Sequence, residues 1–490
     1  MIEDVVKIHD KFSIEIKLSF IAGKKKEISD FACNTWIFIP NSLDINQTTF
    51  TKNDFYRMLK TNIRLITPVF LLRNIANNNE PPFSLLEQSF TNLASEPSRS
   101  KTAEYEYQIR MFLSILRSAL RDEINHITEN TIHDDIAFLI DTYSSNVQKI
   151  TENYRNLRRI INVPTITKEV FNYYLFGDEF MSHIIEEHTF KLISSLEKTT
   201  NINKESLGQL FSLINKEIAY KKEKGYLYVD KNDPEHNRRL VFRLGLLSKY
   251  AENELFLNTD KKRDGAIAEQ VYYSLAAGIS MIFATAMAFS FQQRYGNFTM
   301  PLFVALVISY MLKDRIKDLS RYYFAHKLGK RHFDQKTQIS LNEYDVGMSK
   351  EAMDFIAESK VPPEIMNLRE RSAILEANNR NNMEKIILFR KLVQINRANL
   401  NLSSKFTTQG VNEIIRFNFS NFIAKMDDPF VPLYAPNGDM QYEIINGEKI
   451  YYINLIMQLK SDEQIKYKRY CIILSRKGIR DIETFEKINS

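Results

Sequence analysis

Histidine and acidic residues gather at three places in the N-terminal half of this 490-residue chain. The first is the segment His183-Ile184-Ile185-Glu186-Glu187-His188. Its histidines are five positions apart, about 140° around a helix, whereas an HExxH zinc site needs a spacing of four. Glu179, His183 and Glu187 do share a face and are candidate metal ligands. A solvated helix face is the simpler interpretation of this stripe.

Two shorter pairs also have metal-ligand residue types. Glu123 and His126 have the Glu-x-x-His spacing of di-iron helical bundles, but those sites need a second such pair, which this sequence lacks. His133 and Asp134 would fit a helical metal phosphohydrolase, although an acidic residue at a helix start more simply offsets the helix dipole. We therefore predict no metal and no other cofactor, and keep these residues only as candidates.

Composition excludes several other classes of protein. Glycine (14) and proline (13) are scarce, and none of the glycine-dependent nucleotide or hydrolase motifs GxxxxGK[ST], GxGxxG and GxSxG occurs. The net charge of +6 is spread over the chain without a recognisable nucleic-acid-binding motif, so we expect no nucleic-acid partner. Only Cys33 and Cys471 are present, which fits a reducing compartment. Any catalytic residues remain unknown, and the sequence favours a protein that is not an enzyme.

One window of the chain is almost free of charge. Between Gln270 and Leu312 the only charged residue is Arg294. Residues 271–291 form an apolar stretch of 21 residues, and a second stretch reaches 18 residues when it is counted over 295–312. A helix needs ~20 apolar residues to cross a bilayer. We predict a two-helix transmembrane hairpin with a polar turn between the helices.

The charges that flank this window predict its orientation. Lysine and arginine precede the first stretch and follow the second, so the positive-inside rule places both termini in the cytoplasm. We therefore expect a multi-pass protein of the cell inner (plasma) membrane. Small residues at a spacing of four allow close packing, within one chain or between chains of a homo-oligomer. They are Ala276, Ser280, Ala284, Ala288, Pro301, Ala305 and Ser309.

Residues 313–333 form a basic segment that we predict to be a juxtamembrane helix. Its positive side chains would contact anionic lipid headgroups, at ~1 kcal/mol for each one near the surface. They are Lys313, Arg315, Lys317, Arg321, Lys327, Lys330 and Arg331. A plain cytoplasmic flank of the second span is the simpler alternative.

The polar remainder predicts an α+β protein. We expect a small α/β element over 1–66, with strands at 12–20 and 28–39 and a helix from residue 53. A cytoplasmic helical bundle follows over 84–257. Over 337–490 we expect a cytoplasmic α+β domain, in which helices at 349–359 and 363–377 precede an antiparallel β meander. Asn446-Gly447 would form a hairpin turn of this meander.

Three functions are compatible with these features. The favoured one is a membrane-anchored scaffold or regulatory or signalling protein, with an unknown ligand and an unknown cytoplasmic protein partner. The second is an oligomerising effector that disrupts the membrane or forms a pore. The third is a membrane-bound metal-dependent hydrolase that uses the histidine and acidic residues named above.

Overall fold

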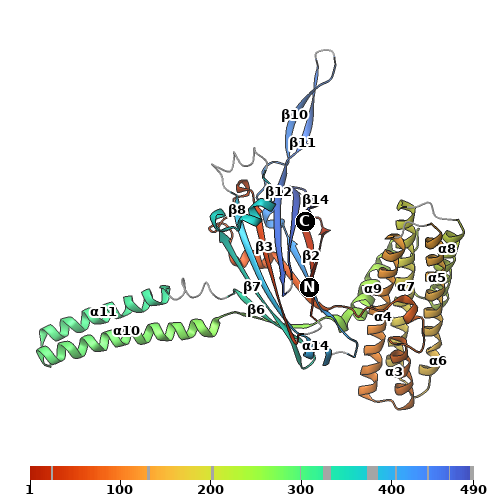
Figure 1. The fold of residues 1–490 in the computed structure, drawn as a ribbon, viewed down its shortest axis with the longest axis horizontal. Coiled ribbons are helices and arrows are strands. Elements are labelled where there is room, and N and C mark those ends of the chain that lie inside the picture. The colour runs from red at the N-terminus through yellow and green to blue at the C-terminus, as the bar shows by residue number, and fades with distance from the viewer. Residues whose placement is uncertain are drawn as a thin grey trace. The chain divides into compact units, whose positions relative to one another are not determined.

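The structure is a computed structural model. It describes residues 1–23, 26–129, 133–199, 204–297, 299–323, 333–371, 384–402, 405–438, 441–462 and 464–485. The chain divides into two compact units. Unit 1 comprises Met1–Ile63, Asn258–Lys405 and Gly410–Ser490, and unit 2 comprises Arg64–Leu257 and Phe406–Gln409. The mixed α+β class is as predicted, with N-terminal strands, a helical middle and a C-terminal antiparallel sheet (Figure 1).

Unit 1 is built on antiparallel sheets. One has the strand order β1-β2-β9-β4, another has the order β14-β13-β12-β3-β8-β7-β6-β5, and β10 and β11 form a separate ribbon. The strands are β1 (Ile2–Asp10), β2 (Ser13–Ile21), β3 (Ile28–Ile39), β4 (Leu59–Leu65), β5 (Asn258–Arg263), β6 (Gln335–Leu341), β7 (Tyr344–Ile356), β8 (Lys385–Asn396), β9 (Gly410–Asn418), β10 (Phe430–Pro436), β11 (Tyr442–Glu448), β12 (Ile450–Ser461), β13 (Ile465–Ser475) and β14 (Gly478–Phe485).

N-terminal and C-terminal strands share both large sheets. β3 lies between β8 and β12, and β2 pairs with β9 along its whole length. The predicted strands at 12–20 and 28–39 are therefore present, but they do not form an element separate from 337–490. The burial of β3 explains the difference, because the four residues from Trp36 to Ile39 are all buried and need covering on both faces.

Of the helices predicted for unit 1, one is shorter than expected and another is wrong. The helix expected from residue 53 ends early: α1 (Lys52–Met58) has a Thr51–Asp54 capping box, and the chain then enters β4. Residues 349–359 lie mostly in β7, where Ala352 and Met353 are buried between β6 and β8. α12 (Pro363–Arg369) begins as predicted, while 372–383 lie outside the described residues. The short helices η1 (Asn41–Leu43), η5 (Glu358–Lys360), α14 (Arg397–Leu402) and α15 (Ser420–Ile423) complete this unit.

The hairpin turn predicted at Asn446-Gly447 is also wrong. Both residues lie within β11, opposite Pro432 and Val431 of β10. The missing side chain of Gly447 makes room for Leu433, which lies 2.8 Å from where a Cβ would stand. The pairing of β10 with β11 therefore outweighs the local preference of Asn-Gly for a turn. By contrast, β12, β13 and β14 pair antiparallel in chain order, as the predicted meander requires.

A buried ionic cluster joins the two large sheets. Lys391 of β8 donates to Glu351 of β7 at 2.8 Å and to Glu413 of β9. Burial alone would lower the pKa of Lys391, but these two carboxylates raise it above its ordinary value. Burial raises the pKa of Glu413. Each of the three side chains is at most 6% exposed, so the charges depend on one another rather than on water.

Unit 2 is a bundle of helices with an aromatic core; it occupies the helical region predicted over 84–257 and begins earlier, with α2. Its helices are α2 (Leu72–Ile75), α3 (Phe83–Ser95), α4 (Arg99–Glu129), α5 (His133–Asn156), α6 (Arg158–Ile161), α7 (Lys168–Thr199), α8 (Lys204–Lys224), α9 (Pro234–Glu252) and η2 (Asn253–Leu255). Tyr154 stacks on Tyr174 and on Phe112. Gly177 is required at this point, because a Cβ there would lie 2.0 Å from the Tyr154 hydroxyl.

The uncharged window forms two helices that pack against each other, α10 (Ala266–Tyr295) and α11 (Met300–Tyr323) (Figure 1). Within the described residues only α10, over Glu269–Tyr295, is long and apolar enough to cross a membrane. Tyr295 is the last residue of α10, so the second helix does not begin at 295 as predicted. Gly296, with φ of 75°, ends α10 and turns the chain.

Candidate functional site: an apolar hairpin and the charged pocket at its foot

Small residues fill the contact between α10 and α11. Ala276 and Ser280 of α10 are 0% and 1% exposed, and Ala305 and Ser309 of α11 are 8% and 3% exposed. The Ser309 hydroxyl donates to the carbonyl oxygen of Ala284 at 3.4 Å, which brings a side chain of one helix against the backbone of the other. This packing resembles that of helices in membranes, where small residues allow a close approach.

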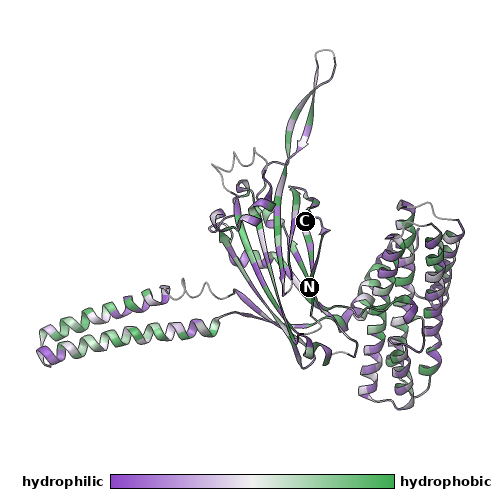
Figure 2. Cartoon of the chain, in the orientation of Figure 1, coloured by the Kyte–Doolittle hydropathy of each residue, from purple (hydrophilic) through white to green (hydrophobic). Residues whose placement is uncertain are grey.

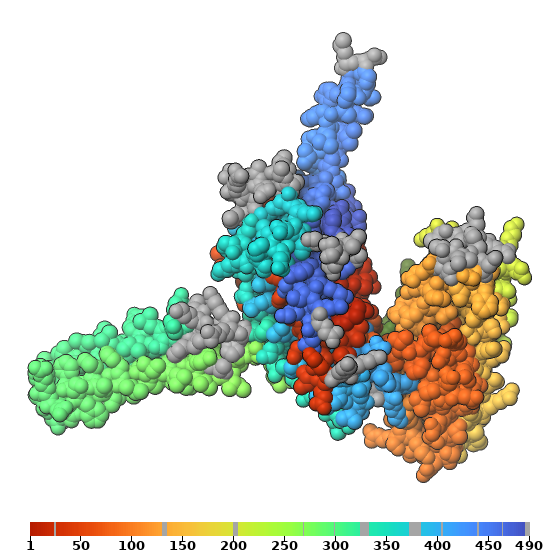
Figure 3. Space-filling view, in the orientation of Figure 1, coloured from red at the N-terminus to blue at the C-terminus, as the bar shows by residue number. Residues whose placement is uncertain are grey.

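The large apolar side chains of the hairpin point outward instead. Their exposed fractions run from 44% for Leu306 to 74% for Met300. Figure 2 shows this apolar character along much of α10 and along the part of α11 nearer the turn, and Figure 3 shows the two helices lying side by side. These outward residues are Val271, Leu275, Ile279, Met281, Ile282, Phe289, Met300, Phe303, Val304, Leu306, Val307, Ile308, Met311 and Leu312.

This distribution is the reverse of that in a water-soluble helical hairpin. A soluble hairpin buries its large apolar side chains, at ~1.5–3 kcal/mol for each, and exposes its small and polar ones. The α10–α11 pair therefore suits an apolar surrounding better than water.

The remaining members of the predicted small-residue stripe have mixed positions. Ala284 and Ala288 are half-buried, and Pro301 is exposed at the start of α11. The stripe is thus largely occupied by contact within one chain. Ala284, Ala288 and Pro301 keep part of their surface free of this contact, and packing between chains stays a prediction.

The first four basic residues predicted to meet lipid lie within α11, which continues to Tyr323. Lys313 lies over the ring of Tyr310 at 3.9 Å, and Arg321 lies over the ring of Tyr273 at 5.4 Å. Arg315 is exposed and Lys317 is half-buried. Three further predicted residues, Lys327, Lys330 and Arg331, lie outside the described residues.

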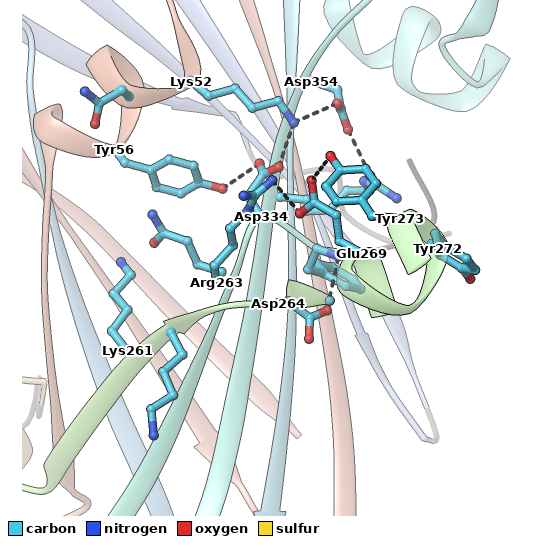
Figure 4. A pocket seen from close by; sticks show the side chains of 17 residues that line it. Lys52, Tyr56, Lys261, Arg263, Asp264, Glu269, Tyr272, Tyr273, Asp334 and Asp354 are labelled. Carbon is cyan, nitrogen blue, oxygen red and sulfur yellow. Dashed lines mark hydrogen bonds and ion pairs between the residues drawn. The ribbon is translucent and has the colours of Figure 1, made fainter. Parts of the chain in front are cut away.

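A pocket of about 670 Å³ lies where the hairpin joins the sheet of unit 1 (Figure 4). β5 and β6 pair with each other and connect to α10 and α11, so both connections reach the same place. Five cationic and four acidic side chains line the pocket. They are Lys52, Lys261, Lys262, Arg263 and Arg390, and Asp264, Glu269, Asp334 and Asp354.

Asp334 is the most highly bonded acid in this pocket. One of its oxygens accepts from Lys52 at 2.7 Å, and the other accepts from the Tyr56 hydroxyl at 3.0 Å and from the Met353 amide at 2.8 Å. Burial raises the pKa of Tyr56, and the adjacent Asp334 raises it further, so this hydroxyl stays a donor. Asp334 therefore ties the chain that returns from α11 to α1 and β7.

A second acid fixes the other connection. Asp264, directly before α10, accepts from the Phe333 amide at 3.2 Å and pairs with Lys350 at 3.5 Å. One turn into α10, Glu269 accepts from the Tyr273 hydroxyl at 2.7 Å and pairs with Arg263 at 3.1 Å. The start of α10 is thus tied to the neighbouring sheet by charged side chains.

The pocket holds its acids in ion pairs rather than presenting them to a metal. Lys52 bridges Asp334 and Asp354, and Arg390 donates to Asp354 at 2.9 Å. Among the described residues no group of three or more histidine, cysteine or acidic side chains is placed to hold a metal ion. The polar contacts of the pocket therefore connect neighbouring segments of the chain to one another.

The candidate metal ligands of α7 are held apart by cations. Glu179 accepts three hydrogen bonds from Arg243, the shortest at 2.6 Å, and the exposed Glu187 pairs with Lys191 at 2.5 Å. His183 is buried 3.4 Å from the ammonium group of Lys221. Burial and this positive charge lower the pKa of His183 to about 3.

The other candidates lie on α4 and α5. Glu123 is half-buried and His126 is exposed on α4. His133 and Asp134 begin α5, and their side chains lie outside the described residues.

Sequence reasoning missed a buried polar network in unit 2. Arg155 of α5 forms two hydrogen bonds with Glu217, at 2.7 and 3.1 Å, and stacks on the Tyr220 ring at 3.5 Å. Asp178 accepts from the hydroxyls of Tyr220 and Tyr226 at 2.7 and 3.0 Å. These residues come from four segments, so no short spacing in the sequence marks them.

No protein-family model matches this sequence, and a search of the curated proteins finds none that is similar to it.

Proposed function

We propose that this protein is anchored in a membrane by α10 and α11 and acts there as a scaffold or regulatory protein. Both helices cross the bilayer, and the polar parts on either side of the hairpin in the sequence lie in the cytoplasm. The observation that carries the proposal is the reversed burial of the hairpin, with small residues inside and large apolar residues outside.

The regulatory role draws its support from the charged pocket. Because Asp264, directly before α10, is bonded to the Phe333 amide and paired with Lys350 of β7, a movement of α10 would act on β5 and β7. The candidate metal ligands whose side chains are described are paired with cations or lie apart. A scaffold or regulator therefore fits these contacts better than a hydrolase.

Membrane fractionation of the full-length protein tests the anchor. Replacing Ile282 and Phe303, which are 70% and 62% exposed on the hairpin, by lysine places two charges in hydrocarbon. Each costs ~2.5–3.5 kcal/mol near the middle of a span, so the alkali-resistant membrane fraction should fall sharply. Phe242→Lys is the matched control, because Phe242 is 71% exposed on α9 of unit 2. Equal membrane fractions for all variants would overturn the proposal.

A further inference from the structure

Two contacts fix how α10 and α11 are aligned. Ser309 lies against Ala284, and Arg321 lies against Tyr273. Tyr273 and Ala284 are eleven residues apart on α10, and Ser309 and Arg321 are twelve residues apart on α11. The two antiparallel helices therefore keep the same register between these two contacts.

This alignment puts the charged part of α11 beside an apolar part of α10. Lys313 is the first charged residue of α11, and the alignment sets it level with Ser280 and Met281. Residues 313–321 then run alongside 272–281 of α10. Only the half of the hairpin nearer the turn is apolar on both helices.

The stretch that both helices share is short. On α11 it runs from Met300 to Leu312, and these thirteen residues span about 20 Å at 1.5 Å each. The hydrocarbon core of an ordinary bilayer is ~30 Å thick. Burying the whole apolar length of α10 in such a core would carry Asp314 and Asp318 into hydrocarbon, where carboxylates are strongly disfavoured.

The polar turn between α10 and α11 marks the other end of the apolar stretch that both helices share. Gln292, Gln293 and Arg294 are exposed at the end of α10, and Asn297 in the turn accepts a hydrogen bond from Gln292 at 2.7 Å. A polar turn with a guanidinium group suits the far interface better than the middle of a bilayer. Polar groups therefore bound the apolar stretch on both sides.

We infer that the hairpin is matched to a thin bilayer, with a hydrocarbon core of about 20 Å, and thins a thicker bilayer around itself. This inference rests on the proposed function and adds the kind of membrane that the hairpin fits. Lys313 and Arg315 can snorkel toward the headgroups, which increases the hydrocarbon thickness that the hairpin matches by the length of a side chain. Their positions at the end of the apolar stretch suit that role. Mismatch beyond that length weakens insertion, because each ångström of deformation costs free energy.

Flotation of the full-length protein with phosphatidylcholine vesicles tests the inference. The vesicles differ only in chain length, with 14, 18 or 22 carbons in each monounsaturated acyl chain. We expect the floated fraction to be highest with the 14-carbon lipid, and the partition coefficient to fall by about tenfold or more with the 22-carbon lipid. Equal binding to all three, or a preference for the thickest, would overturn the inference.

A lengthened hairpin provides the matched variant. Replacing Lys313, Asp314, Arg315, Lys317 and Asp318 together by leucine extends the apolar part of α11, and should move the preference to the 18- or 22-carbon lipid. Arg238→Leu with Arg239→Leu, on exposed positions of α9, controls for added hydrophobicity and should keep the original preference. An unchanged preference in the lengthened variant would contradict the inference. Absence of flotation with every lipid, with the protein in a soluble oligomer that covers its hairpins, would instead overturn the proposed function.

Discussion

The Ser309 hydroxyl of α11 donates a hydrogen bond to the backbone carbonyl of Ala284 on α10, at 3.4 Å. A side chain can reach the backbone of a neighbouring helix only where the residues between them are small. This contact therefore explains why the hairpin packs through alanine and serine. The helices can approach this closely because their large apolar residues face outward.

The close packing of the hairpin should depend on residue size at the contact. Ser309→Leu inserts a large side chain beside Ala284 and should push the helices apart. Spin labels at the exposed positions Ile282 and Leu306 would report a longer and broader distance distribution than in the parent. Ile308→Leu, at an exposed neighbouring position, should leave the distribution unchanged. If S309L kept the parent distance, the helices would not be packed as described.

The buried cluster of unit 1 should be sensitive to loss of its cation. Lys391→Met leaves Glu413 buried without its cation and leaves Glu351 only its longer pair with Lys261 at 3.6 Å, so we expect a loss of ~3–5 kcal/mol in the free energy of unfolding. Urea titration in detergent, followed by the fluorescence of the buried Trp36, measures it, because the chain has one tryptophan.

Two further variants interpret that result. Adding Glu351→Gln and Glu413→Gln to Lys391→Met should restore part of the stability, because the uncompensated charges are then gone. Lys7→Met removes the exposed partner of Glu15 and should change stability by ~0–1 kcal/mol. A loss as small for K391M as for K7M would show that the cluster is not a buried network.

Acid should destabilise unit 2 through His183. The pKa of this imidazole is about 3 in the fold, against 6.5 for an ordinary histidine, because it is buried beside Lys221. Its contribution to stability is therefore fully present above pH 6.5 and is lost as the pH falls from 6.5 toward 3. The slope approaches ~1.4 kcal/mol per pH unit within that window.

Far-ultraviolet circular dichroism during urea titration at several pH values measures this slope. His183→Gln should flatten the dependence between pH 6 and 4, whereas His126→Gln, at an exposed position on α4, should keep the parent slope. Equal slopes for the two variants would mean that His183 is not the group that titrates.

The pocket at the foot of the hairpin should hold the returning chain in place. Asp334→Asn weakens the bonds to Lys52 and Tyr56, and should destabilise this connection by ~1–3 kcal/mol. Limited proteolysis should then cut faster between α11 and β6. Asp260→Asn, which affects only the exposed pair with Lys262, is the control and should be cut at the parent rate.

The ribbon of β10 and β11 should be dispensable for folding. It shares no sheet with the rest of unit 1, and its apolar side chains, such as Tyr434 and Ile444, are 68% and 56% exposed. Replacing residues 431–447 by a short glycine linker should therefore leave the urea midpoint monitored by Trp36 within experimental error. A large loss would show that the ribbon supports the sheets.

Periodicity in the sequence located the helices of unit 2 and several strands of unit 1, because apolar spacing reports local structure. It could not show that β3 lies between strands from the other end of the chain, since pairing partners leave no local signal. β7 was missed for a related reason: residues 349–359 carry charges that suit a helix surface, but Glu351 is neutralised by Lys391, 40 positions away.

The candidate site, like the fold, could be predicted from the sequence only in part. The small residues of the hairpin were visible in their spacing of four, and four of the seven are buried between the helices. They are Ala276, Ser280, Ala305 and Ser309. The pocket was not, because Lys52, Asp264 and Asp334 come from three distant segments. Residue spacing alone made Glu179 and His183 candidate metal ligands. It could not show that Arg243 and Lys221 occupy the space beside them.

The side of the membrane reached by the turn tests the central claim most directly. A single cysteine is placed at Asn297 in the turn or, as a control, at Lys231 in unit 2. Both native cysteines are buried, and burial raises the pKa of Cys33 to about 12, so the new thiol reacts first. With intact cells and a membrane-impermeant maleimide, we predict labelling at 297 and, at 231, labelling only after permeabilisation. Protection of 297 until the cells are opened would contradict the account.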